Sequence, residues 1–187
     1  MSAKASILAA IRANKPGPRP LPELPTYTAS PAENLEVFTE VIGGSKARVI
    51  RREELVAYVA EHFAGAQSIV STVPEIAGNF TVAPGTEPLA LAGVDLAILK
   101  GQFAVAENGA IWMTEDEAVV RVLPFITQHL IIVVEGSIVP TMHEAYPLAK
   151  VGETGFGVFI AGPSKTADIE QSLVIGAHGP RSLAVAL

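Results

Sequence analysis

The sequence contains no cysteine. The protein therefore has no thiol nucleophile, cannot form a disulfide and offers no thiolate ligands to an iron–sulfur cluster. If it takes part in redox chemistry, a partner protein or a bound cofactor must carry the electrons.

Aromatic and charged residues are also scarce. Aromatic residues make up 6% of the 187 residues and charged residues 17%, whereas 49% are hydrophobic. This composition argues against disorder and requires a core of Ala, Val, Ile and Leu. An aliphatic core of this kind is typical of a buried parallel sheet covered by helices.

Positive charge is in the minority, and long apolar runs are missing. The chain has 13 basic and 19 acidic residues, a net charge of −6. Because an acidic chain repels phosphate backbones, we expect no nucleic acid partner. The apolar stretch 7–11 is too short for a signal peptide, and no run approaches the ~18–20 residues of a membrane span. We expect a cytoplasmic protein without a membrane span.

Proline is concentrated in one segment near the start. Residues 3–13 have the pattern of a short helix, and five prolines follow between Pro16 and Pro25. Such a run favours an extended, polyproline-like linker. We therefore predict an N-terminal helix and proline-rich arm over residues 1–30 and an α/β domain over 31–187. The basic residues of the arm form either a solvated surface or a docking arm for a partner.

Apolar patterning predicts strands that alternate with helices. The predicted strands are 47–50, 68–73, 94–99, 103–107, 110–114, 130–134, 157–161, 173–175 and 183–186. The predicted helices are 34–42, 52–64, 119–125, 138–149 and a segment from 162 through 172. This order predicts a three-layer α/β/α fold with a mostly parallel, doubly wound sheet and one β-hairpin, at Asn108-Gly109.

Three loops are candidates for the functional site. Ligands of doubly wound sheets usually bind at the carboxyl ends of the strands, which selects residues 107–109, 162–168 and 176–180. Glu107 is a candidate nucleophile or general base, and His178, between small residues, is a candidate proton-transfer group. The alternatives are an exposed turn acid and a turn histidine bonded to backbone.

The segment Gly162–Glu170 predicts an anion site. Ser164 has the position of a helix N-cap, which leaves free N–H groups to which Lys165 adds charge and Thr166 a hydroxyl. An ordinary capped helix is the alternative. The predicted ligand is a small carboxylate or phosphate, and the predicted ligand-binding residues are Asn108, Gly109, Gly162, Ser164, Lys165, Thr166, Asp168 and Gly179.

Several familiar motifs fail on single residues. Pro163 stands where a P-loop needs lysine, and Pro147 stands where an HExxH zinc motif needs its second histidine. His62 and His129 have no matching ligands, so no metal site is predicted. Ile160 interrupts a GxGxxG pattern, so no dinucleotide fingerprint is present.

The order of these motifs resembles the LutC/YkgG family of lactate-utilisation (LUD) domain proteins. The resemblance lies in Ala106–Ala110, Leu123-Pro124, Ile131–Val134 with Ile138-Val139-Pro140, Gly162–Glu170 and His178-Gly179-Pro180. It implies a fold of the NagB/RpiA/CoA-transferase group. It also implies a role in oxidising L-lactate to pyruvate beside iron–sulfur LutA/LutB-like partner proteins, with the clusters on those partners and no cofactor in this chain.

A second function of a different class stays open. Glu107-Asn108-Gly109 is similar to the Glu-Asn-Gly segment that holds the catalytic glutamate of CoA-transferases in the same fold group. The chain is then a stand-alone CoA-transferase-like or sugar-phosphate-isomerase-like enzyme that uses Glu107. The glycine-rich CoA-binding pattern of those enzymes is not evident here, and a shared fold alone does not establish function.

Overall fold

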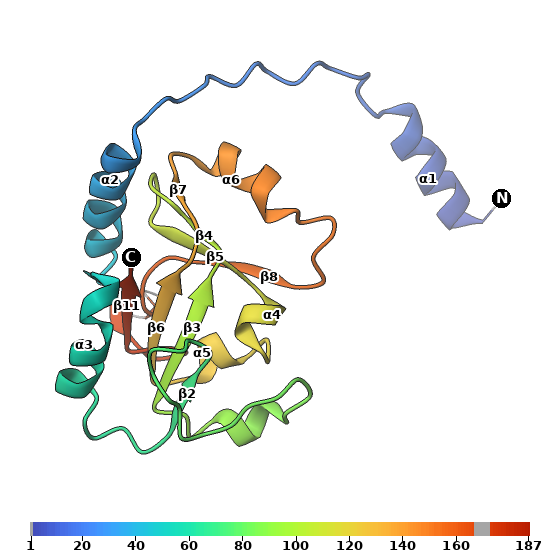
Figure 1. Ribbon diagram of the computed structural model, residues 1–187. Helices are drawn as coiled ribbons and strands as arrows, with labels where there is room; N and C mark the ends of the chain where they lie inside the picture. Colours follow the sequence, from blue (N-terminus) through green and yellow to red (C-terminus); the bar gives the residue numbers. More distant parts are fainter. Residues whose placement is uncertain (1, 167–172) are drawn as a thin grey trace.

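The computed structural model describes residues 2–166 and 173–187 (Figure 1). Its centre is a five-stranded sheet in the order β1-β11-β6-β3-β2, in which every neighbouring pair is parallel. The strands are β1 (Arg48–Ile50), β2 (Ile69–Ser71), β3 (Leu96–Gly101), β6 (His129–Val134) and β11 (Ser182–Ala186). The predicted α/β class with a mostly parallel central sheet is therefore confirmed.

Buried aliphatic side chains alternate between the two faces of this sheet. In β3, Leu96 and Ile98 pack on the face covered by α3 (Leu55–His62), while Ala97 and Leu99 pack on the opposite face. The short 3₁₀ helix η1 (Arg52–Glu54) precedes α3, so the predicted helix 52–64 has a tighter first turn. Such strands, buried on both faces, produce the near-continuous apolar runs seen in the sequence.

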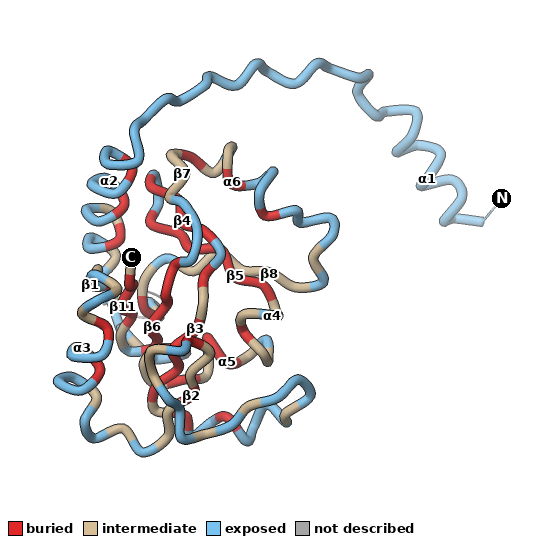
Figure 2. The backbone as a smooth tube through the Cα atoms, in the orientation of Figure 1, coloured by how far each residue is buried: buried red, intermediate tan, exposed pale blue. Residues whose placement is uncertain are grey.

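The opposite face is covered by helices and by a second sheet. Its core contains Phe38 and Ile42 of α2 (Pro31–Gly44) and residues of β5. The other elements on this side are η2 (Pro88–Leu91), α4 (Glu115–Ala118) and α5 (Leu123–Ile126). Figure 2 shows the buried residues gathered between these layers.

The predicted Asn-Gly hairpin belongs to this second sheet. It has four strands in the order β7-β4-β5-β8, with bounds β4 (Phe103–Val105), β5 (Ala110–Thr114), β7 (Ile138–Val139) and β8 (Gly157–Ile160). Its outer face packs Phe103 and Trp112 against Ala145 and Ala149 of α6 (Met142–Ala149). The sequence predicted the hairpin but not its separation from the central sheet.

Two predicted helices are wrong in part. Val119 has a φ of +63° and separates α4 from α5, where one helix over 119–125 was expected. Ile138 and Val139 form strand β7 beside β4 instead of beginning a helix. The residue before a proline avoids helical backbone angles, and Val139 precedes Pro140, which explains why the helix starts only at Met142.

The helix predicted from residue 162 onward is wrong where the structure describes it. Lys165 and Thr166 form strand β9 (Lys165–Thr166), which pairs in antiparallel register with β10 (Val174–Ile175). Ser164 therefore does not cap a helix, and the predicted anion seat at a helix start is lost. Residues 167–172, including Asp168, lie outside the described part of the chain.

The N-terminal segment forms α1 (Ala3–Ala13) and then a chain without regular structure up to Pro31. Residues 2–33 are all exposed, and α1 has no buried residue. Figure 1 shows α1 standing away from the rest of the molecule. The predicted boundary near residue 30 stays a prediction. No helix in the described ranges is long and apolar enough to cross a membrane.

Candidate functional site

Glu107 lies at the end of β4, where the hairpin turns. Its Oε1 atom accepts a hydrogen bond of 3.0 Å from the backbone N–H of Met142, the first residue of α6. Thr141 occupies the N-cap position of that helix, but its side chain makes no capping bond. Glu107 therefore satisfies a helix donor that the cap residue leaves free, and its negative charge suits the positive end of the helix dipole.

Asn108 and Gly109 shape the turn itself. The Oδ1 atom of Asn108 accepts a bond of 3.0 Å from the N–H of Ala110, and Gly109 has a φ of +67°. A Cβ on Gly109 would lie 2.9 Å from the Cβ of Ile42, so only glycine allows the turn to pack against α2. Both predicted ligand residues thus have a structural role that needs no ligand.

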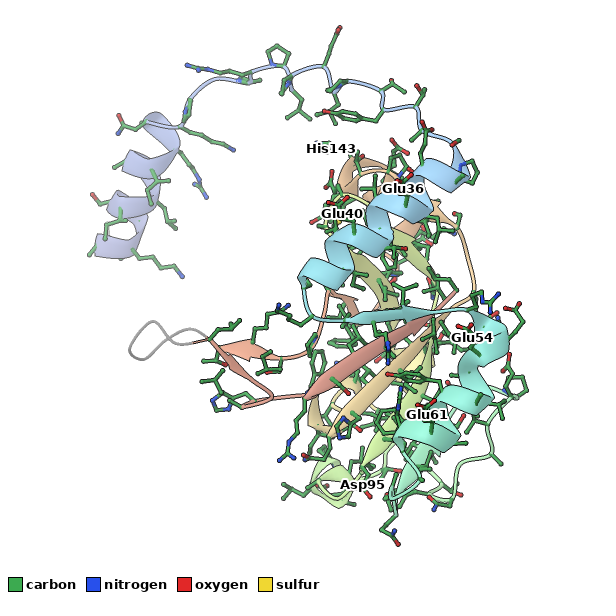
Figure 3. The ribbon with its side chains drawn as sticks, turned by 90° about the vertical axis from the view of Figure 1, so that its left-hand side faces the viewer. Glu36, Glu40, Glu54, Glu61, Asp95 and His143 are labelled. Atoms are coloured by element: carbon green, nitrogen blue, oxygen red, sulfur yellow. The ribbon has the colours of Figure 1, made fainter. Side chains whose placement is uncertain are left out.

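A cavity of about 380 Å³ borders Glu107. It is lined by the end of the proline-rich arm, the start of α2 and the turn before α6: Tyr27, Thr28, Ala29, Glu33, Asn34, Val37, Ala106, Glu107, Pro140 and Thr141. The lining has two carboxylates and no cation. Figure 3 shows Glu36, Glu40 and His143 gathered at this end of the molecule. This acidic setting is unfavourable for the small anion that the sequence predicted.

The loops around Ser164 and Gly179 do meet. The N–H of Ser164 donates to the carbonyl of Pro180 at 2.9 Å, and the N–H of Gly176 donates to the carbonyl of Ser164 at 3.0 Å. A Cβ on Gly179 would lie 3.0 Å from the Cβ of Ser164. The structure therefore brings together the two segments that carried most of the sequence resemblance.

The other predicted site residues of these two loops lie close to Ser164 and Gly179 in the sequence. Gly162 has a φ of +96°, and a Cβ added to it would lie 2.7 Å from the Nζ of Lys165. Lys165 and His178 are exposed, and Thr166 is half-buried. The joint pocket of Glu107 and His178 stays a prediction, because no contact joins them among the residues that the structure describes.

The reasoning from strand ends was wrong for these loops. Glu107 follows a strand of the second sheet, and the loop 176–180 precedes β11, so it lies at the amino edge of the central sheet. The rule on carboxyl ends applies to parallel strands of one sheet, and the sequence did not reveal that two sheets are present.

The carboxyl edge of the central sheet carries an ion-pair cluster that sequence reasoning missed. Arg52 Nη2 lies 2.7 Å from Glu75 Oε1 and 3.3 Å from Glu135 Oε1. These hydrogen bonds raise the pKa of Arg52. The pKa of Glu75 is lowered, first by a backbone hydrogen bond to its carboxylate and second by the hydrogen bond from Arg52. The guanidinium is shared by two carboxylates, so it is not free to bind an anionic ligand.

Sequence reasoning also missed a cavity with polar lining residues at the amino edge of the central sheet. A cavity of about 450 Å³ there is lined by His62, Phe63, Gly65, Ala66, Asp95, Gln128, His129 and Arg181. Burial lowers the pKa of His129, and the charge of Arg181 lowers it further. The sequence held no local signal for this group, since its members come from four separate segments. Within the described ranges, no three His, Asp or Glu residues are arranged to hold a metal ion.

Comparison with known proteins adds a family match. Residues 89–187 match the family model described as LUD domain. A "Lactate utilization protein C" of Bacillus pumilus (strain SAFR-032) is 36% identical over 91 residues, which cover 45% of this chain and 38% of that protein. The protein of the same name from Bacillus subtilis (strain 168) is 32% identical over 93 residues, covering 46% and 39%.

These alignments span about two-fifths of the length of the relatives. A crystal structure of a DUF162 family protein from Deinococcus radiodurans is similar in fold, with a TM-score of 0.61 at 23% identity. That similarity covers 85% of this chain and 98% of the other. The segment matched by the family model includes Glu107, the loops around Ser164 and Gly179, and the amino-edge residues from Asp95 to Arg181.

Proposed function

The chain belongs to the LUD domain family, and from that premise we propose that it is a LutC-like subunit or ligand-binding protein of an L-lactate utilisation system. The observation that carries the proposal is its similarity, through the LUD segment, to relatives named "Lactate utilization protein C". A cytoplasmic location belongs to the same proposal.

The chemistry of lactate oxidation supports a division of labour in which partner proteins carry the electrons and this chain binds a ligand or organises the assembly. Conversion of L-lactate to pyruvate removes two electrons and two protons from the hydroxyl-bearing carbon and its hydroxyl group. The chain has no cysteine for a redox disulfide or for thiolate ligation of a cluster. We propose that iron–sulfur partner proteins of the LutA/LutB type accept the electrons and that this chain binds a ligand or organises the assembly.

The N-terminal arm is suited to contact with such partners. Helix α1 exposes Ile7, Leu8 and Ile11, and the first twenty residues carry four basic side chains and no acid. An exposed apolar stripe with basic neighbours gains free energy by docking on an apolar, acidic surface. We propose that this arm is the docking element for the iron–sulfur partners.

Co-purification and lactate-dependent dye reduction test this function. The chain is expressed alone and together with any cysteine-rich reading frames that lie beside its gene. We expect the mixture to co-purify and to reduce the dye with L-lactate, and the chain alone to give no reduction. Robust reduction by the colourless, metal-free chain would refute the division of labour. Failure to retain any such partner would refute the assembly role.

A CoA-transferase-like or isomerase-like enzyme is the second candidate, favoured by one observation. Oε1 of Glu107 is bonded to the start of α6, and Oε2 makes no hydrogen bond within the described part of the chain. The side chain borders a cavity, so Oε2 is available to a substrate. Acyl transfer between acetyl-CoA and short carboxylates, followed in the wild type and in Glu107→Gln, tests it. Turnover that the substitution abolishes without loss of stability would favour this function over the subunit role.

A further inference from the structure

The cavity at the amino edge of the central sheet has a lining that differs from that around Glu107. It lies where α3 ends and where β3, β6 and β11 begin, and Figure 3 shows Asp95 at this end of the molecule, opposite to Glu36 and Glu40. Its polar lining residues are His62, Asp95, Gln128, His129 and Arg181. This lining is rich in hydrogen-bond donors.

Arg181 is held at the cavity by its backbone and the stem of its side chain. Its N–H donates to the carbonyl of Gln128 at 2.8 Å. Gly176 has a φ of +79°, and a Cβ there would lie 2.6 Å from the Cγ of Arg181. The glycine thus makes room for the arginine stem. Among the described residues no carboxylate forms an ion pair with the Arg181 guanidinium, in contrast to Arg52.

The imidazole of His129 is oriented by one neighbour, and no other residue among those described bonds to its second nitrogen. Its Nδ1 atom lies 2.8 Å from the Oγ of Ser182, its register partner on the adjacent strand. The ring of Phe63 packs at 5.2 Å between centroids. Because Nδ1 is engaged by Ser182, Nε2 is the atom that can bond to a ligand.

The second histidine of the lining, His62, is held by Arg48 of β1. Its Nε2 atom lies 3.1 Å from Nη1 of Arg48. A guanidinium can only donate, so the Nε2 atom of His62 accepts this bond.

Acidic groups near the cavity oppose an anion only weakly. Asp95 uses Oδ2 to accept the N–H groups of Gln67, at 2.8 Å, and Ser68, at 3.1 Å. Its charge is thus partly balanced by backbone dipoles. Glu61 lies beside His62 with its side chain 77% exposed, where water and salt screen it.

We propose that this cavity binds a small carboxylate with an oxygen on the neighbouring carbon, that is, a 2-hydroxy or 2-oxo acid. Arg181 holds the carboxylate through two parallel N–H bonds, the geometry that a guanidinium favours. His129 Nε2 bonds to the adjacent oxygen. A volume of about 450 Å³ accommodates a three-carbon acid and its water. The choice of a 2-hydroxy or 2-oxo acid rests on the proposed function, whereas the inference that the ligand has a carboxylate rests on Arg181.

Calorimetric titration of the full chain tests the site. The probes are L-lactate, pyruvate, acetate and the neutral lactamide, with wild type, Arg181→Gln and the matched charge control Arg19→Gln. Glutamine keeps the stem that packs on Gly176, and Arg19 is an exposed arm residue. We expect L-lactate or pyruvate to bind more tightly than acetate, and lactamide not to bind.

Arg181→Gln should weaken binding of the preferred acid by about 10- to 100-fold, as expected for lost charge-assisted hydrogen bonds, and Arg19→Gln should not. Equal affinity for the acid in wild type and Arg181→Gln would overturn the proposal, as would binding of lactamide as tight as that of the acids. The absence of binding of both acids at a ligand concentration of about 20 mM, 20-fold above a millimolar dissociation constant, would also overturn it. Partner assembly without acid binding would overturn this site alone. Acid binding without partner assembly would overturn the subunit function alone.

Discussion

The carboxylate of Glu107 bonds to the backbone N–H of Met142, across 35 positions of sequence, at a distance of 3.0 Å. The contact links the hairpin of the second sheet to the helix that covers the outer face of that sheet. A glutamate in a turn thereby contributes to the stability of a distant helix. The same bond fixes one carboxylate oxygen, and the other makes no hydrogen bond to the residues that the structure describes.

Replacement of Glu107 should reveal this capping role. We expect Glu107→Ala to lower the free energy of unfolding by about 0.5–2 kcal/mol, the range for loss of a helix cap, measured by urea denaturation. Glu107→Gln retains an acceptor oxygen and should cost less. Glu36→Gln, on the exposed side of α2, serves as the control. Wild-type stability in Glu107→Ala would show that the cap contributes nothing.

Glycine at position 109 should be required for packing. Gly109→Ala places a Cβ 2.9 Å from Ile42 on a backbone with φ of +67°, so we expect a loss of about 1–3 kcal/mol. Gly43→Ala, inside α2 with open space around it, should be neutral or stabilising by about 0.5–1 kcal/mol. Thermal and urea unfolding of both variants compare the two effects. The idea fails if both substitutions shift stability alike.

The arm should be dispensable for folding. Deletion of residues 1–25 removes the isolated helix α1 and the chain after it, and residues 2–25 are all exposed. We expect the truncated chain to keep its cooperative melt and its melting temperature within about 2 °C, because no core contact is lost. Loss of a cooperative transition would place the arm within the folded unit. The same truncation should abolish retention of the iron–sulfur partners.

Stability should fall on mild acidification because of His129. Burial, and then Arg181, lower the pKa of this imidazole in the folded protein, while the unfolded chain titrates near 6.5. Because the pKa of His129 is lower in the folded protein, its contribution to the free energy of unfolding is fully present above about pH 6.5. This contribution is lost as the pH falls through the pKa of the folded protein. The charges that act on the ring are those of Arg181 and Asp95, while Ser182 bonds to Nδ1 and His62 lines the same cavity.

Urea denaturation between pH 7.5 and pH 5 measures this dependence. We expect the wild type to lose more stability over that interval than His129→Gln, whose side chain does not titrate. Carboxylates such as Glu117 have a lowered pKa because bonds from Thr114 and Gln102 outweigh burial, and they act at lower pH in both proteins. Parallel pH profiles for the two proteins would exclude the histidine as the cause.

Sequence alone determined those elements whose signals are local. The aliphatic run that forms β6 is typical of a strand buried on both faces, and Asn108-Gly109 between two β-prone runs is a strong signal for a turn. The proline run likewise fixed the extended character of the arm. In each case the information lies within about ten residues, so no distant partner is needed to read it.

Tertiary structure decided the rest, because the deciding contacts join distant segments. Lys165 and Thr166 follow a good helix-cap residue, yet pairing with β10 makes them a strand. Whether the hairpin joins the central sheet depends on β7 and β8, which lie far along the chain. Arg181 and His129 line one cavity only because β11 pairs with β6. Strand pairing exchanges backbone hydrogen bonds between remote residues, and a local pattern does not specify which partner is chosen.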